Sequence, residues 1–276
     1  MDFIYVCNES GIIITKCIGN NERIKIPYEI DGKPVIGIAE YAFSDNCVVK
    51  EINIEANLIE IGSFAFQFCE ELESINLPQS IRNIGESAFE GCVKLKEIVL
   101  PALRKINKSL FEECSSLTYI EIPYGVEFID ERAFEFCLNL QQVDMPEGIR
   151  EIRNGAFFCC RRLKEFKMPD SVTKTGKEIL LGCRKLKTVH LSESLEKIEV
   201  GLLARCRELK KIEIPKSVKI ICNGAFAECS SCNNFILDDK NIRIGVRVFE
   251  GCNNLLDNVE FVESMKRHLE NQKGEK

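Results

Sequence analysis

Histidine is scarce in this sequence: among 276 residues there are only two, His190 and His268. The sequence therefore supplies few histidines for a Cys/His nucleophile pair or a histidine-ligated metal site. The glycine-rich phosphate-loop patterns, the G-x-S-x-G nucleophile turn and the H-E-x-x-H zinc motif are also absent from the sequence. We therefore expect a protein without catalytic activity, cofactor or metal.

The sequence also lacks a long apolar run, and no window approaches the roughly 18 apolar residues of a membrane-spanning helix. The first residues, MDFIYVCNESG, carry an acid at Asp2 and have neither the basic start nor the apolar stretch of a secretory signal. We therefore expect a cytoplasmic protein with no membrane span. Its 15 cysteines, an odd number, are then expected to be reduced thiols.

Acidic residues are under-represented in one segment. Residues 161–220 contain 16 Lys+Arg and 8 Asp+Glu, a net charge of +8, whereas the whole chain carries −6. The remainder of the chain therefore carries −14. A basic segment on an acidic protein can determine which partner binds there.

Cysteine, in contrast, is abundant and recurs at a nearly constant interval. Ten cysteines, which we name the cysteine column, are separated by 22 or 23 residues: Cys47, Cys69, Cys92, Cys114, Cys137, Cys160, Cys183, Cys206, Cys229 and Cys252. Other positions follow the same period, and the unit reads C-x-x-L-x-x-I-x-L-P-x-x-I-x-x-I-G-x-x-A-F-x-x-C. Self-similarity at such a period indicates a repeat architecture.

Each half of the unit predicts a local structure. The I-x-L alternation is typical of a short strand with one buried face, and proline ends that strand because it cannot donate a hydrogen bond to a ladder. The I-x-x-I segment predicts a second short extended or bent piece. The spacing in G-x-x-A-F-x-x-C favours one short helical turn. A single unit cannot bury its apolar edge, but stacked units can.

The repeated cysteines could serve a metal, a redox array or packing. A metal site needs ligands that converge on one point, whereas the column supplies one cysteine per unit. Buried cysteine acts as a small hydrophobe and a weak donor, so we interpret the cysteines and the phenylalanines beside them as structural. The positions that we expect to be structural are Cys69, Cys92, Cys114, Cys137, Cys160, Phe66, Phe89 and Phe134.

The unit LKEIVLPALRKINKSLFEEC, residues 95–114, and its copies resemble the leucine-rich repeat of the BspA-like (Treponema-type) class. The lead-in IPYEIDGKPVIGIAEYAF, residues 26–43, is also similar to that class. The resemblance implies a right-handed solenoid of about ten repeats, with a concave parallel β-sheet and short helical or extended segments on the convex side. For exported relatives it implies adhesion or host interaction.

The ends of a solenoid need caps, because bare edge strands invite association. Residues 3–18 predict a hairpin that turns at Asn8–Gly11. At the other end, Asp257 and Glu260 could form a capping box for a short amphipathic helix. We therefore divide the chain into a hairpin cap and lead-in (1–35), a solenoid (36–256), and a capping helix with a polar tail (257–276).

Function is expected on the outward residues of the I-x-L strands. These residues form rows that change from acidic to basic along the chain, which suits a protein or peptide partner with the opposite charge order. Tyr119 and Tyr124 are the expected aromatic anchors. The candidate partner-binding residues are Tyr119, Glu121, Tyr124, Asp144, Lys167, His190, Lys211 and Glu213.

The first hypothesis is therefore a monomeric, non-enzymatic scaffold that recognises a protein or peptide through its concave face. The alternatives are adhesion, as in exported relatives, and binding of nucleic acid or an acidic glycan on a basic ridge within residues 161–220. An acidic isoelectric point of about 5.3 and the lack of an aromatic stacking row argue against nucleic acid. The ridge comprises Arg161, Arg162, Arg184, Lys185, Arg205 and Arg207.

Overall fold

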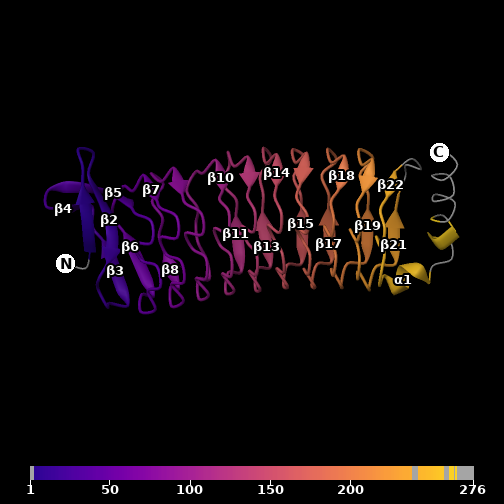
Figure 1. Cartoon of the computed structure of the whole chain (residues 1–276), viewed down its shortest axis with the longest axis horizontal. Helices are drawn as coiled ribbons and strands as arrows, with labels where there is room; N and C mark the ends of the chain where they lie inside the picture. The colour runs from indigo at the N-terminus through magenta and orange to yellow at the C-terminus, as the bar shows by residue number, and fades with distance from the viewer. Residues whose placement is uncertain (1–2, 238–241, 258–260, 264, 266–276) are drawn as a thin grey trace.

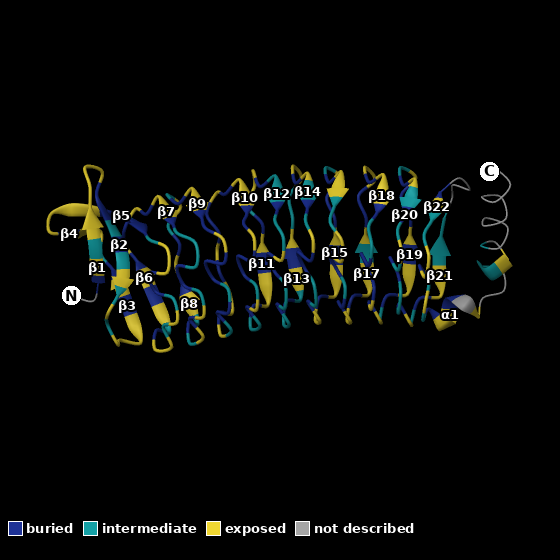
Figure 2. Cartoon of the chain, in the orientation of Figure 1, coloured by how far each residue is buried: buried dark blue, intermediate teal, exposed yellow. Residues whose placement is uncertain are grey.

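The protein is described by a computed structural model that covers residues 3–237, 242–257, 261–263 and 265. The chain winds into coils that stack along one axis into an elongated solenoid, with a hairpin at the N-terminal end (Figure 1). Buried residues occur in every coil and alternate with exposed residues along the strands (Figure 2). This arrangement confirms the predicted repeat solenoid.

One side of the solenoid is built from the I-x-L segments, which we call the first ladder. Its strands pair in parallel, as in the register Tyr119↔Gln142 and Glu121↔Asp144. In the strands of residues 119–121 and 142–144, the buried central residue alternates with exposed neighbours, as the sequence pattern predicts. The strands are β3 (Arg23–Ile26), β6 (Glu51–Ile54), β8 (Ser74–Ile75), β11 (Tyr119–Glu121), β13 (Gln142–Asp144), β15 (Glu165–Lys167), β17 (Thr188–His190), β19 (Lys211–Glu213) and β21 (Asn234–Ile236).

The I-x-x-I segments form a second parallel ladder of very short strands. Its first members belong to the N-terminal lead-in, and the others contribute two residues each. The strands are β2 (Ile12–Cys17), β5 (Lys33–Ile38), β7 (Glu60–Ile61), β9 (Asn83–Ile84), β10 (Lys105–Ile106), β12 (Phe128–Ile129), β14 (Glu151–Ile152), β16 (Lys174–Thr175), β18 (Lys197–Ile198), β20 (Ile220–Ile221) and β22 (Arg243–Ile244).

The A-F-x-x-C segments close the third side, and their phenylalanines stack along the core. Ring centroids of Phe66 and Phe89 lie 5.2 Å apart with an interplanar angle of 7°, and those of Phe89 and Phe111 lie 5.6 Å apart. Offset stacking of this kind adds to the gain from burial alone. The ring series is interrupted where Leu180 and Leu203 replace phenylalanine, and both leucines are fully buried.

The A-F-x-x-C segments form isolated hydrogen-bonded turns, whereas the sequence spacing predicted one short turn of helix. Each contains a bond from the cysteine amide to the phenylalanine carbonyl three residues earlier, as between Cys92 and Phe89 at 3.2 Å. The next bonds run to the following coil: the Phe89 amide donates to the Leu110 carbonyl at 3.1 Å. Residues with positive φ, such as Ser87 at 53°, interrupt the right-handed helical backbone, and the Ser87 amide donates to the Lys108 carbonyl of the following coil.

The first member assigned to the cysteine column is wrong. The Asn46 amide donates to the Phe43 carbonyl at 3.2 Å, which is the bond that column cysteines make in later coils. Asn46 therefore occupies the column, and Cys47 is exposed one position beyond it. The side-chain oxygen of Asn46 instead accepts the amides of Val48 and Val49 at 3.1 and 3.0 Å.

At the N-terminal end, β1 (Phe3–Cys7) pairs antiparallel with β2, as the predicted hairpin requires. The side-chain oxygen of Asn8 accepts the amides of Ser10 and Gly11 in the turn, at 2.9 and 3.0 Å. A short strand, β4 (Glu29–Ile30), pairs antiparallel with β5.

At the C-terminal end, the helix α1 comprises Asn253–Leu256. The predicted capping box includes Glu260, and the predicted helix and tail fall largely on residues 258–260, 264 and 266–276, which lie outside the described residues. Within the described part, no helix has the length and apolar character needed to cross a bilayer.

Candidate recognition surface

The exposed face of the first ladder brings most of the candidate partner-binding residues together. The parallel register places Glu121 beside Asp144 and Lys167 beside His190. Their side chains point to solvent because the alternate residues of each strand fill the core. Tyr124 is the exception, since it lies 83% exposed in the turn after β11 and not on the strand face.

A hydrogen-bonded group lies at the centre of this face. The Tyr119 hydroxyl donates to Asp144 Oδ2 at 2.8 Å, and Gln142 Nε2 donates to Asp144 Oδ1 at 2.8 Å. The bond to Asp144 raises the pKa of Tyr119 to about 12, because the neutral phenol is the donor. The side chains of Tyr119 and Asp144 are therefore ordered before a partner binds.

The following coils carry the basic part of the face, although His190 and Lys211 there have local carboxylate partners. His190 Nε2 lies 3.4 Å from Asp170 Oδ1, and Lys211 Nζ lies 2.8 Å from Glu213 Oε2. The lysine bond lowers the pKa of Glu213. For Lys167, no carboxylate lies within ion-pair distance in the described part of the chain.

The basic ridge divides into paired and unpaired cations. Lys185 lies 2.5 Å from Glu208, and Arg205 and Arg207 lie 3.0 and 3.7 Å from Glu228. Arg161, Arg162 and Arg184 are exposed, and none of them forms an ion pair with a described residue.

The cysteine column lies inside the solenoid, away from this face. Its nine members from Cys69 to Cys252 are fully buried, and each Sγ donates to a backbone carbonyl of the preceding coil at 3.1–3.4 Å. Burial raises the pKa of the Cys69 thiol to about 12 and holds the pKa of the Cys92 thiol well above its ordinary value. The Cys69 and Cys92 thiols therefore stay protonated at neutral pH, whereas a hydrogen bond with Cys229 lowers the pKa of Cys252.

The sequence also contains a Cys-x-x-Cys pair, Cys229 and Cys232, which the period of the cysteine column alone does not reveal. Cys232 takes the place of a column leucine and is fully buried. The Sγ of Cys229 donates to the Leu203 carbonyl at 3.2 Å and that of Cys232 to the Asn234 carbonyl at 3.6 Å. Within the described ranges, no group of three or more His, Cys, Asp or Glu side chains could hold a metal ion.

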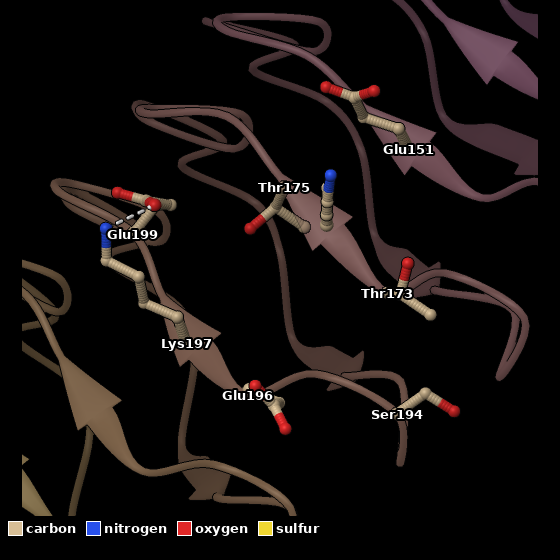
Figure 3. Close-up of a pocket in the computed structure, with 8 residues that line it drawn as sticks. Glu151, Thr173, Thr175, Ser194, Glu196, Lys197 and Glu199 are labelled. Atoms are coloured by element: carbon tan, nitrogen blue, oxygen red, sulfur yellow. Dashed lines mark ion pairs between the residues drawn. The ribbon is translucent and has the colours of Figure 1, made fainter.

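A polar pocket, which the sequence analysis also missed, opens on the second ladder. Strand β16 pairs with β14 but not with β18, and the pocket of about 540 Å³ lies at this interruption (Figure 3). The signal for it was Thr175, which replaces a column aliphatic and has a buried Oγ1 without a hydrogen-bond partner. The lining residues are Glu151, Thr173, Lys174, Thr175, Ser194, Glu196, Lys197 and Glu199.

The repeat and its geometry agree with a known family. The BspA type leucine rich repeat region matches residues 36–164 and 150–271, with six copies. The chain belongs to the BspA-type leucine-rich repeat family. No curated protein matches the chain at a significant level.

Solved structures of leucine-rich repeat proteins match this chain. A leucine-rich repeat protein from Bacteroides ovatus is 29% identical with a TM-score of 0.85, and the match covers 92% of this chain and 68% of that one. The leucine-rich repeat protein of Treponema pallidum is 24% identical with a TM-score of 0.38, covering 97% and 93% of the two chains.

Proposed function

We propose that this BspA-type repeat protein is a recognition scaffold that binds a protein or peptide along the exposed face of the first ladder. The observation that carries the proposal is the hydrogen-bonded group of Tyr119, Gln142 and Asp144 beside an oppositely charged set of coils. An aromatic side chain that is already ordered loses little entropy on binding. The change of sign along the face selects the orientation of an extended partner.

The proposed role is binding and not catalysis, and it takes place in a reducing compartment such as the cytoplasm. The support for the compartment is that the buried column sulfurs act as hydrogen-bond donors, which requires reduced thiols. Disulfide-based folds belong to oxidising compartments.

Site-specific photo-crosslinking tests the location of the site. A photoreactive residue at Val99, which is 76% exposed on the first-ladder side, is compared with one at Lys105 in β10 of the second ladder. We expect polypeptide adducts from cell extract at position 99 and few at position 105. Adducts at position 105 alone would contradict the proposal.

Two tyrosines provide a matched pair for the affinity measurement, made with the partner identified from the adducts. Tyr119 lies on the face, whereas Tyr124 is more exposed and lies in the neighbouring turn. We expect Tyr119→Ala to weaken binding by about tenfold or more, as loss of a central aromatic anchor does, and Tyr124→Ala to change it little. Equal effects of the two substitutions would remove the first-ladder face as the site.

A further inference from the structure

Basic residues occupy equivalent positions in three consecutive coils next to the first ladder. One position follows the column cysteine directly, and the other follows it by four residues, just before the strand. We call these two rows the basic columns, and they consist of Arg161, Arg184 and Arg207 in the first row and Lys164, Lys187 and Lys210 in the second.

The backbone holds successive members of the basic columns in register. The Lys187 amide donates to the Lys164 carbonyl at 2.8 Å, and the Lys185 amide donates to the Arg161 carbonyl at 3.2 Å. Neighbouring coils with this type of bonding lie about 4.8 Å apart. The side chains of all six residues are exposed.

The lysine row continues into the N-terminal coils with alternating charges, Lys50, Glu73 and Lys96. Lys96 lies 3.1 Å from Glu73 in the preceding coil, and Lys94, two residues after its column cysteine, lies 2.7 Å from Glu71. Each of those lysines therefore neutralises a carboxylate one coil away. The chain is thus able to place acids between its lysines at this edge of the solenoid.

In the basic columns, like charges replace this alternation, except that Arg207 lies 3.7 Å from Glu228. Lys164 contacts only the neutral Gln141 side chain, at 3.0 Å, and no carboxylate lies within ion-pair distance of Lys187 or Lys210 among the described residues. Like charges at directly opposed positions of neighbouring strands destabilise a fold. An anionic partner would remove this repulsion, so the free protein is poised to bind one.

We infer that the basic columns bind an acidic protein segment. This inference rests on the proposed function and specifies the chemistry of the partner over coils 161–210. Two features favour carboxylates over nucleic acid. Glu165 is exposed and Glu208 half-buried among the cations, where both oppose a continuous phosphate backbone. Phe166 is the one Phe, Tyr or Trp side chain of these coils, and it is buried, so it offers no stacking surface for a base.

The test compares two triple variants with the same change in net charge. The column variant carries Lys164→Gln, Lys187→Gln and Lys210→Gln. The control variant carries Lys50→Gln, Lys94→Gln and Lys96→Gln, which removes lysines of the same edge that are paired with Glu22, Glu71 and Glu73.

Binding is measured by fluorescence anisotropy with a labelled peptide of alternating glutamate and glycine. We expect the column variant to bind about tenfold more weakly than the unmodified protein, the control variant to stay within about twofold, and the affinity to fall as salt rises. Equal weakening in both variants would show attraction by overall charge and overturn the inference. Tighter binding of a single-stranded DNA of equal charge would overturn it as well.

Thermal unfolding of the protein in the absence of the peptide gives a second measurement. At low salt, the column variant should melt at the same or a higher temperature than the unmodified protein, because the repulsion is gone. The control variant should melt at a lower temperature, because its carboxylates lose their partners. A lower melting temperature for the column variant alone would show that its lysines stabilise the fold, against the inference.

The two proposals fail in different ways. Peptide binding that depends on the basic columns, together with no crosslink at position 99, would remove the first-ladder proposal and leave this inference standing. Crosslinks at position 99 with no effect of the column variant on peptide binding would do the reverse.

Discussion

The thiol sulfur of Cys92 lies 3.2 Å from the carbonyl oxygen of Phe66, in the preceding coil. The same carbonyl also accepts the Cys69 amide at 3.1 Å, so the buried thiol is its second donor. We expect Cys92→Ser to lower the free energy of unfolding by about 1–3 kcal/mol, because the shorter side chain buries an imperfectly paired hydroxyl. Urea unfolding measures the change. Cys47→Ser is the control, since Cys47 is exposed outside the column, and an equal loss in both variants would contradict the packing role.

Gly85 illustrates how closely neighbouring coils approach. A Cβ atom at this position would lie 2.3 Å from the Ser63 amide nitrogen and 2.5 Å from the Ser63 Cα. We expect Gly85→Ala to destabilise the protein by about 1–3 kcal/mol through overpacking. Gly37 provides the comparison, because the nearest atom to its Cβ would lie at 3.6 Å. If Gly37→Ala costs as much in urea unfolding, close approach is not the cause.

Glu135 makes stability depend on pH near neutrality. Partial burial, and then the nearby negative charge of Glu112, raise the pKa of Glu135 to about 7, from an ordinary value of 4.5. The folded protein therefore holds a proton that the unfolded chain releases between these values, so this contribution is full below about pH 4.5 and is lost as pH rises through about 7.

We expect Glu135→Gln to flatten the fall in melting temperature across this pH interval, since an amide has no proton to lose. Glu250→Gln is the control, because Glu250 follows the last repeat phenylalanine in the same way and is exposed. Melting temperatures measured across the interval should change shape only for the Glu135 variant. A flattened profile for the Glu250 variant would refute the assignment.

Tyr119 should ionise at higher pH than an ordinary tyrosine. Its bond to Asp144 raises its pKa to about 12. We expect Asp144→Asn to bring that pKa down toward 10, because the charged acceptor is lost. Ultraviolet titration of tyrosinate follows the change, and Asp130→Asn, whose carboxylate contacts Arg153, should leave the titration unaltered. No difference between the two variants would mean that the bond is absent in solution.

The repeat made the solenoid predictable, whereas details within a coil were not. The I-x-L alternation correctly located buried residues such as Ile120 and Val143, because one buried face forces a period of two. The assignment of Cys47 failed because only cysteines were counted. The A-F-x-x-C spacing would have selected Asn46, three residues after Phe43, whose backbone bond shows the true position.

The candidate surface was predictable in position but not in pairing. Sequence period alone placed Glu121, Asp144 and Lys167 on one face, and the parallel register agrees. Which cations form an ion pair depends on the offset between coils. Sequence alone therefore could not predict that Arg205 pairs with Glu228 whereas Arg184 forms no ion pair with a described residue. Tyr124 was misplaced because the turn after Pro123 carries it off the strand.

The bond from each column thiol to the carbonyl of the coil before it has a consequence for the length of the protein. Every interior coil presents the same donor on one side and the same acceptor on the other, so a whole unit can be duplicated or deleted without redesigning its neighbours. Length is then an adjustable property of this architecture. A change of one unit within residues 161–210 would add or remove one arginine and one lysine of the basic columns together, and affinity for an extended partner would change in discrete steps.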